Sequence, residues 1–101
     1  MGIQYTNMEK LDPAKVKRKS LDLKCLGNEH RLGIVMYLKI KKSASVGEIA
    51  DNLKISFKAT SKHLAILEKG RVLARQSDSP FVIYSISSDS SGLIKSIISL
   101  L

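Results

Sequence analysis

Lysine and serine side chains recur at helical spacing over residues 57–69. At about 100° per residue, Lys58, Lys62 and Lys69 fall on one side of a helix, and Ser61 lies at the edge of this stripe. Lysine binds guanine acceptors or phosphate oxygens, and serine hydrogen-bonds to either. A narrow basic stripe bordered by small side chains suits the major groove of duplex DNA, although lysine runs are also typical of a solvated helix face.

The other side of the same segment is apolar. Phe57, Thr60, Leu64 and Leu67 cluster on the helical wheel, so we predict that all four pack inward. His63 lies at the border of this face. Its position is compatible either with partial burial or with a contact to a base or phosphate.

Local signals indicate two short helices joined by a tight turn. Residues 45–48 match the capping-box pattern, in which a serine and a glutamate bond to each other's backbone amides and open a helix. Ser56 is a second N-cap candidate, and the helix after it is predicted to run over 56–69 and to stop at Gly70. This is a helix-turn-helix unit.

Two longer helices are predicted before this unit. Asp12 followed by Pro13 starts the first one, and Gly27 ends it. Asn28 then caps a helix from Glu29 to about Ile40. Residues 1–12 lack hydrophobic periodicity and are predicted to form a mobile N-terminal arm.

After Gly70 the periodicity changes. Segments 72–76 and 81–86 read as strands of a hairpin, which in this position is a wing, and a last apolar helix begins at Gly92. The predicted fold is therefore mainly α with a small β hairpin: a winged helix-turn-helix with about five helices and a two-stranded wing. We expect residues 13–101 to form one DNA-binding and dimerisation domain.

Composition restricts the classes of function. The chain has 101 residues, enough for one domain, and a net charge of +8 that favours a polyanionic partner such as double-stranded DNA. No apolar run approaches the roughly 20 residues that span a bilayer, so we expect a cytoplasmic protein with no membrane partner.

No residues are grouped in a pattern for catalysis. There is no Ser-His-Asp arrangement, phosphate loop or dinucleotide motif, so we predict a protein that is not an enzyme and needs no cofactor. Cys25 is the single cysteine and is expected to be an inert core residue. The alternative is a redox-sensing thiol whose pKa is depressed by the adjacent Lys24.

Residues 28–38, 46–50 and 55–67 together resemble the ArsR-type winged-helix family of transcriptional regulators, and the Ser-x-His-Leu-x-x-Leu stretch from Ser61 is the most specific part. The resemblance implies a homodimer that docks two recognition helices in successive major grooves. It places DNA contacts at Lys58, Ser61 and Lys62, with Ser56 and His63 flanking them. In the interpretation as a DNA-binding regulator, Arg75 adds a phosphate contact from the wing. The implied dimer interface lies on the first and last helices: Leu21, Leu93, Ile94, Ile97, Ile98 and Leu101.

The sequence departs from the metal-sensing members of this family. Ser45 and Gly47 stand where such members carry paired cysteines, and the last helix contains no Asp, His or Glu. Because zinc, cadmium and arsenic require thiolate or imidazole ligands, we predict no metal site. The expected wing tip is also unusual, since Asp78 would repel phosphates and Pro80 stands where glycine would help.

Three functions fit these observations. The first is sequence-specific repression by a homodimer that occupies an operator. The second is a protein-interaction module, in which the apolar last helix docks another protein and the fold no longer reads DNA. The third is nonspecific coating of DNA, which the net charge alone would support.

Overall fold

A computed structural model describes residues 11–78 and 80–101. The elements are α1 (Pro13–Leu26), α2 (Glu29–Lys41), β1 (Ser43–Ser45), α3 (Val46–Leu53), α4 (Phe57–Lys69), β2 (Leu73–Asp78), β3 (Phe81–Ile86) and α5 (Gly92–Leu100). The predicted fold class is confirmed, with five helices and a small antiparallel sheet in the described ranges. All but the last two residues of the predicted N-terminal arm lie outside the described residues.

The helices begin where side chains can satisfy their first amides. Asp12, Asn28, Ser45 and Ser56 are N-caps, as the sequence predicted, and each accepts a hydrogen bond from an amide of the first turn. The capping box is complete, because the amide of Ser45 also donates to the carboxylate of Glu48. These contacts set the starts of α1 to α4 from the local sequence.

The sheet has three strands in the order β1-β3-β2, all antiparallel. The sequence analysis predicted only the β2–β3 hairpin and missed β1, in which Ala44 lies opposite Tyr84. A three-residue strand is too short to show a readable alternation, and it forms here only because β3 offers an edge to pair with. The hairpin strand β2 begins at Leu73 and is longer at its tip end than predicted.

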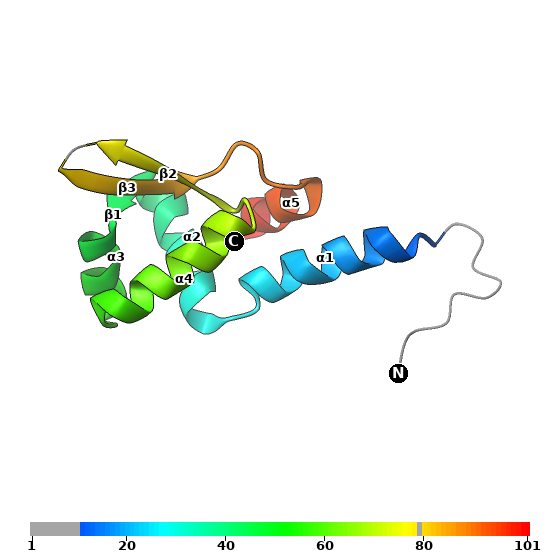
Figure 1. Cartoon of the computed structure of the whole chain (residues 1–101), viewed down its shortest axis with the longest axis horizontal. Coiled ribbons are helices and arrows are strands. Elements are labelled where there is room, and N and C mark those ends of the chain that lie inside the picture. Colours follow the sequence, from blue (N-terminus) through cyan, green and yellow to red (C-terminus); the bar gives the residue numbers. More distant parts are fainter. Residues whose placement is uncertain (1–10, 79) are drawn as a thin grey trace.

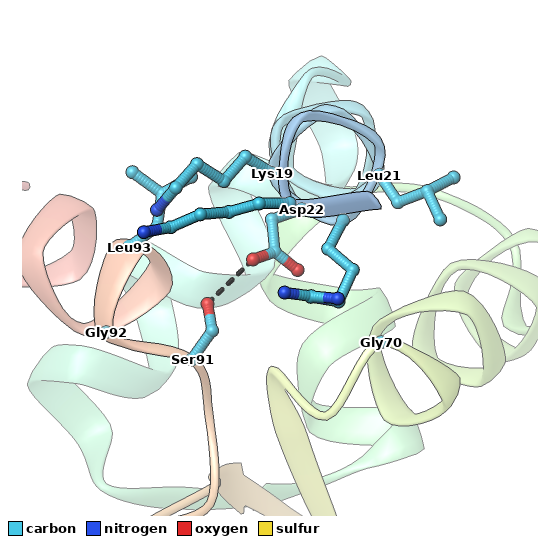
Figure 2. Close-up of a pocket in the computed structure, with 9 residues that line it drawn as sticks. Lys19, Leu21, Asp22, Gly70, Ser91, Gly92 and Leu93 are labelled. Atoms are coloured by element: carbon cyan, nitrogen blue, oxygen red, sulfur yellow. Dashed lines mark hydrogen bonds between the residues drawn. The ribbon is translucent and has the colours of Figure 1, made fainter. Parts of the chain in front are cut away.

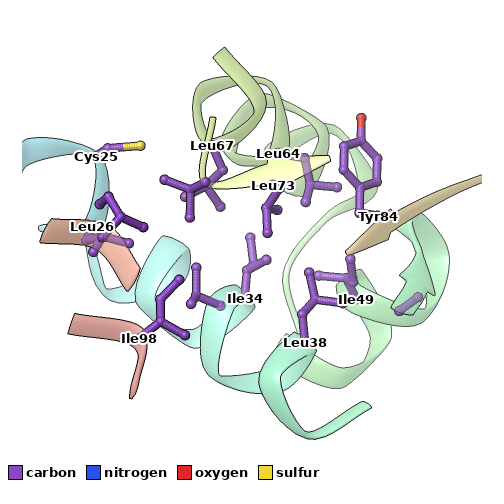
Figure 3. Close-up of a cluster of buried hydrophobic side chains, with 14 residues drawn as sticks. Cys25, Leu26, Ile34, Leu38, Ile49, Leu64, Leu67, Leu73, Tyr84 and Ile98 are labelled. Atoms are coloured by element: carbon purple, nitrogen blue, oxygen red, sulfur yellow. The ribbon is translucent and has the colours of Figure 1, made fainter. Parts of the chain in front are cut away.

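The core lies between α2, the helix-turn-helix unit and the sheet. Ile34, Leu38, Ile49, Leu64 and Leu67 are almost fully buried and face one another across this space (Figure 3). Burying such aliphatic side chains stabilises the fold by about 1.5 to 3 kcal/mol each. The core thus holds α4 against α2 and leaves the other side of α4 free.

The prediction that Phe57 packs inward is wrong. Phe57 is 63% exposed, although Thr60, Leu64 and Leu67 on the same wheel face are buried. Phe57 is the first residue of α4, and the core begins only one turn later, so most of its ring is left in solvent.

The two ends of the molecule differ in character. Figure 1 shows the wing tip, α3 and the start of α4 at one end, and α5 and the projecting α1 at the other. Only Cys25 and Leu26 are buried within α1. None of the helices in the described ranges combines the length and apolarity required to cross a bilayer.

Candidate nucleic-acid interface

The basic stripe of α4 is open to solvent. Lys58, Lys62 and Lys69 are exposed, Ala65 between them is also exposed, and Ser61 is half-buried at the edge. Because Thr60, Leu64 and Leu67 on the opposite face are buried, the orientation of α4 about its axis is set by the core. The stripe therefore presents cationic and hydroxyl groups outward along about three turns of helix.

The start of α4 is held by the Ser56 cap. The Ser56 hydroxyl oxygen accepts a hydrogen bond from the Ala59 amide at 3.0 Å, and the Ser56 carbonyl accepts from the Thr60 hydroxyl at 2.8 Å. The second bond satisfies the hydroxyl of Thr60, which is fully buried. The hydroxyl proton of Ser56 stays available for donation to an acceptor such as a phosphate oxygen.

His63 points away from the stripe toward α2. Its Nδ1 lies 3.3 Å from Nη1 of Arg31, and its ring centroid is 5.4 Å from that of His30. Arginine can only donate, so Nδ1 of His63 accepts and the proton of the neutral ring is on Nε2. Partial desolvation, together with the charges of Arg31 and His30, lowers the pKa of His63. This environment favours a packing role for His63, with Nε2–H as its free donor.

Arg31 links the end of α1 to α4. Besides its contact with His63, its Nε donates to the Cys25 carbonyl at 2.7 Å and its Nη2 donates to the Lys24 carbonyl at 3.2 Å. Both carbonyls belong to the last turn of α1, where the helix itself supplies few backbone donors, and the Lys24 carbonyl also accepts from the Gly27 amide at 3.2 Å. The guanidinium of Arg31 thus connects α1 to α4, the helix that carries the basic stripe.

The wing supplies one cation near its base. Arg75 is exposed on β2 and lies opposite Tyr84 of β3. Burial raises the pKa of Tyr84, Glu68 adds to this effect, and Arg75 opposes it. Arg75 and Tyr84 are thus neighbours across the two strands, and the side chain of Arg75 stays accessible from solvent.

Two exposed aromatic side chains were missed as candidate site residues. Phe57 and Phe81 are both 63% exposed, and together with Val46 they line a groove of about 370 Å³ between the start of α4 and the wing. The signal in the sequence was the position of Phe57 directly after an N-cap, where a side chain extends beyond the core of a short helix.

The predicted dimer residues divide into two groups. Leu21 is 55% exposed, and Leu93, Ile97 and Leu101 are half-buried, so each retains apolar surface. Ile94 and Ile98 are instead buried in the core of the protomer, because α5 packs on α1 and α2 through the face that carries them. Leu23 of α1 and Leu100 of α5, which the sequence analysis did not name, are largely exposed.

A hollow of about 420 Å³ lies beside the contact between α1 and α5 (Figure 2). Leu21 and Leu93 contribute apolar surface to it, and its cations are Lys15, Arg18 and Lys19. A hydrogen bond of 2.7 Å from the Ser91 hydroxyl to the Asp22 carboxylate crosses the hollow and joins the two helices. This contact orients the start of α5 relative to α1.

Cys25 lies in the core, where its thiol donates to the Ile66 carbonyl at 3.7 Å. Burial raises the pKa of Cys25, Arg31 opposes this shift, and Asp22 adds to it. The relevant nearby cation is thus Arg31, not Lys24 as the alternative hypothesis required. Over residues 11–78 and 80–101, no three His, Cys, Asp or Glu side chains are grouped as a metal site would need.

The helices and the three-stranded sheet define a winged helix-turn-helix fold, and comparison with known proteins gives the family. The family model described as the arsR family of bacterial regulatory proteins matches residues 28–74. The chain is 33% identical over 82 residues to the transcriptional activator HlyU of Vibrio cholerae, which corresponds to 81% of this chain and 74% of that protein. The chain therefore belongs to the ArsR family and is a transcriptional regulator of the ArsR and HlyU type.

Solved structures agree with this assignment. Reduced HlyU from Vibrio cholerae superposes with a TM-score of 0.75 at 33% identity, covering 93% of this chain and 90% of that one. HlyU from Vibrio vulnificus gives 0.75 at 29% identity, with 94% of both chains covered. The transcriptional repressor PagR of Bacillus anthracis gives 0.72 at 28% identity, covering 88% of this chain and 98% of that one.

Proposed function

We propose that this protein is a homodimeric repressor that binds double-stranded DNA with α4, the predicted recognition helix 56–69, in the major groove. The observation that carries the proposal is the exposed face of α4, where Lys58 and Lys62 flank Ser61. In helix-turn-helix proteins the second helix of the unit enters the major groove, and its outward side chains contact base edges and backbone.

Each residue of the stripe has a chemical role in this proposal. Lys58 and Lys62 bind guanine acceptors or phosphate oxygens, and Ser61 donates or accepts a hydrogen bond at a base or phosphate. Ser56 donates its hydroxyl proton to a phosphate at the start of the helix. Arg75 binds a phosphate from the wing. His63 contributes at most through Nε2–H, because Arg31 occupies its Nδ1.

The homodimer is proposed from the apolar surface at the other end of the fold. Leu21, Leu93, Ile97 and Leu101 leave apolar area uncovered along α1 and α5, and Leu100 is 85% exposed. Covering this surface with a second copy would remove it from water. A twofold axis through these helices would place two α4 helices for half-sites about one helical turn apart.

Repression is the simplest mode of action, because a bound dimer blocks a promoter by occupancy, whereas activation requires a further productive contact. Among the similar proteins, PagR is called a repressor and HlyU an activator. A reporter gene controlled by the selected operator distinguishes repression from activation. Expression that rises on deletion of the regulator supports repression, and expression that falls identifies an activator.

The DNA-binding role is tested by the salt dependence of operator affinity. The operator is first obtained by selecting bound sequences from random duplexes. Lys62→Ala should weaken binding and, if Lys62 contacts a phosphate, lower the slope of log K against log salt by about 1. Lys15→Ala is the matched control, because it removes the same charge from the projecting end of α1 (Figure 1).

The outcomes separate the three functions. A palindromic sequence and a loss of affinity specific to Lys62→Ala support the regulator. Binding without any enriched sequence indicates nonspecific coating, and the absence of affinity for duplex DNA at moderate salt indicates a protein-interaction module. Equal losses in Lys62→Ala and Lys15→Ala would remove Lys62 from the interface.

The dimer is tested by Leu21→Asp, which places a charge on the proposed interface. Analytical ultracentrifugation should show a shift toward monomer, with weaker operator binding as a consequence. Phe81→Asp is the control, because Phe81 is also highly exposed but begins β3 at the tip of the wing, away from α1 and α5 (Figure 1). A dimer that persists in Leu21→Asp would place the interface elsewhere.

A further inference from the structure

The ring of Phe57 is 63% exposed at a position outside the buried core. It is the first residue of α4, and the Ser56 cap holds that turn in place without it. The buried contacts of α4 begin at Thr60. Leaving most of a phenyl ring in water has a cost, which burial of the ring in a complex would offset.

The surroundings of Phe57 are apolar on one side and basic on the other. Phe81 and Val46 line the groove beside the ring, while Lys58 follows it along the chain and is exposed. Ser61 lies one turn further along α4, at about 40° from Phe57 on the helical wheel. Phe57 thus continues the edge of the basic stripe at the end nearest the wing.

We propose that Phe57 determines sequence specificity by contacting the C5 methyl group of a thymine. The inference rests on the proposed function, since it requires α4 to lie in the major groove. In that geometry the first residues of the recognition helix reach base edges. Among the groups that unmodified DNA presents in the major groove, only the thymine methyl is apolar, and phenylalanine is among the side chains that contact it.

The positive charges of Lys58 and Lys62 beside Phe57 favour DNA over a partner protein as the molecule that covers the ring. An apolar partner protein would have to cover Phe57 while leaving Lys58 and Lys62 desolvated or paired. A thymine next to phosphates matches both the apolar ring and the cations beside it. Contact of the ring with deoxyribose would also bury it, but this contact would not depend on base identity.

The test removes a methyl group and nothing else. In the operator selected from unmodified duplexes, each thymine is replaced in turn by uracil, and the dissociation constant is measured for the unaltered protein and for Phe57→Ala. We expect one thymine of each half-site to be sensitive. Uracil at this thymine in a single half-site should raise the dissociation constant of the unaltered protein about fourfold, and uracil in both half-sites should raise it about 15-fold.

Phe57→Ala should bind the thymine and uracil operators equally at that position, because the ring that senses the methyl is gone. Phe81→Ala is the matched control: it removes an equally exposed phenyl ring from the same groove, and it should keep the uracil effect. Circular dichroism of each variant shows whether its fold is retained.

Two results overturn the inference. If replacing thymine by uracil leaves the dissociation constant of the unaltered protein unchanged at every position, the protein makes no stabilising contact with a thymine methyl group. If the uracil effect is the same in Phe57→Ala, another residue reads it. Either result leaves the regulator proposal standing, whereas a selection without any enriched sequence overturns the proposed function and this inference together.

Discussion

Replacing Arg31 by methionine should destabilise the protein and change the titration of His63. The guanidinium supplies donors to the carbonyls of Cys25 and Lys24 and to Nδ1 of His63, at 2.7, 3.2 and 3.3 Å. Hydrogen bonds from a charged group contribute roughly 1.5 to 3 kcal/mol, and the bond to Lys24 is exposed and contributes less. Arg31 is only half-buried, so solvent screening reduces the sum of the two part-buried bonds, and we expect Arg31→Met to lower the free energy of unfolding by about 2 to 3 kcal/mol.

The assay is urea unfolding at one fixed protein concentration, because self-association would make the midpoint depend on concentration. Arg31→Lys is the matched control. It keeps the charge but offers a single nitrogen in place of the planar fork, so about half of the loss should return. A loss below about 0.5 kcal/mol in Arg31→Met would refute the reasoning, since it would mean that water replaces the guanidinium at these acceptors.

The same variant tests the cause of the lowered His63 pKa. Removal of the Arg31 charge should raise the pKa of His63 part of the way toward its ordinary value of 6.5, with burial and His30 still lowering it. Because the folded state binds this proton less readily than the unfolded state, stability should fall as the pH decreases through 6.5 toward the folded pKa. NMR titration, with His63→Gln to assign the signals, should show the raised pKa of His63 in Arg31→Met, and urea unfolding at several pH values should show the loss of stability. An unchanged titration of His63 in Arg31→Met would contradict this account.

Two further predictions concern backbone positions around the helix-turn-helix unit. Lys54 ends α3 in the left-handed region at φ 57°, where a side chain is strained and glycine is not. Lys54→Gly should therefore raise the free energy of unfolding, measured by urea denaturation, by about 1 kcal/mol. Destabilisation would show that contacts of the Lys54 side chain outweigh the strain of its backbone. The backbone of Gly70, with φ of −78°, would accept alanine, but a Cβ there would lie 2.9 Å from the Cys25 sulfur. Because of this clash, Gly70→Ala should lower the free energy of unfolding by about 1 to 3 kcal/mol. The penalty should largely vanish in a Cys25→Ala background, and a penalty that persists there would rule out this clash as its cause.

Helix boundaries were predictable because their causes are local. The caps at Asp12, Asn28, Ser45 and Ser56 each involve a side chain and an amide two or three residues away. The exposed stripe of α4 was also predictable, because one buried face of a helix fixes the direction of the opposite face. These features follow from the periodicity and capping of single segments.

Other features depended on segments distant along the chain. The strand β1 exists because residues 43–45 pair with residues 83–85, and His63 turns toward Arg31, which is 32 residues away. No local pattern encodes such partners.

The order of residues by itself determined the helices, the winged fold class and the basic face of α4, because hydrophobic periodicity and capping act within a few residues. Only the tertiary structure decided that Phe57 stands in solvent and that Ile94 and Ile98 are buried within the protomer. Burial is a property of the space around a side chain, and that space is filled by other elements whose positions are established only when the whole chain has packed.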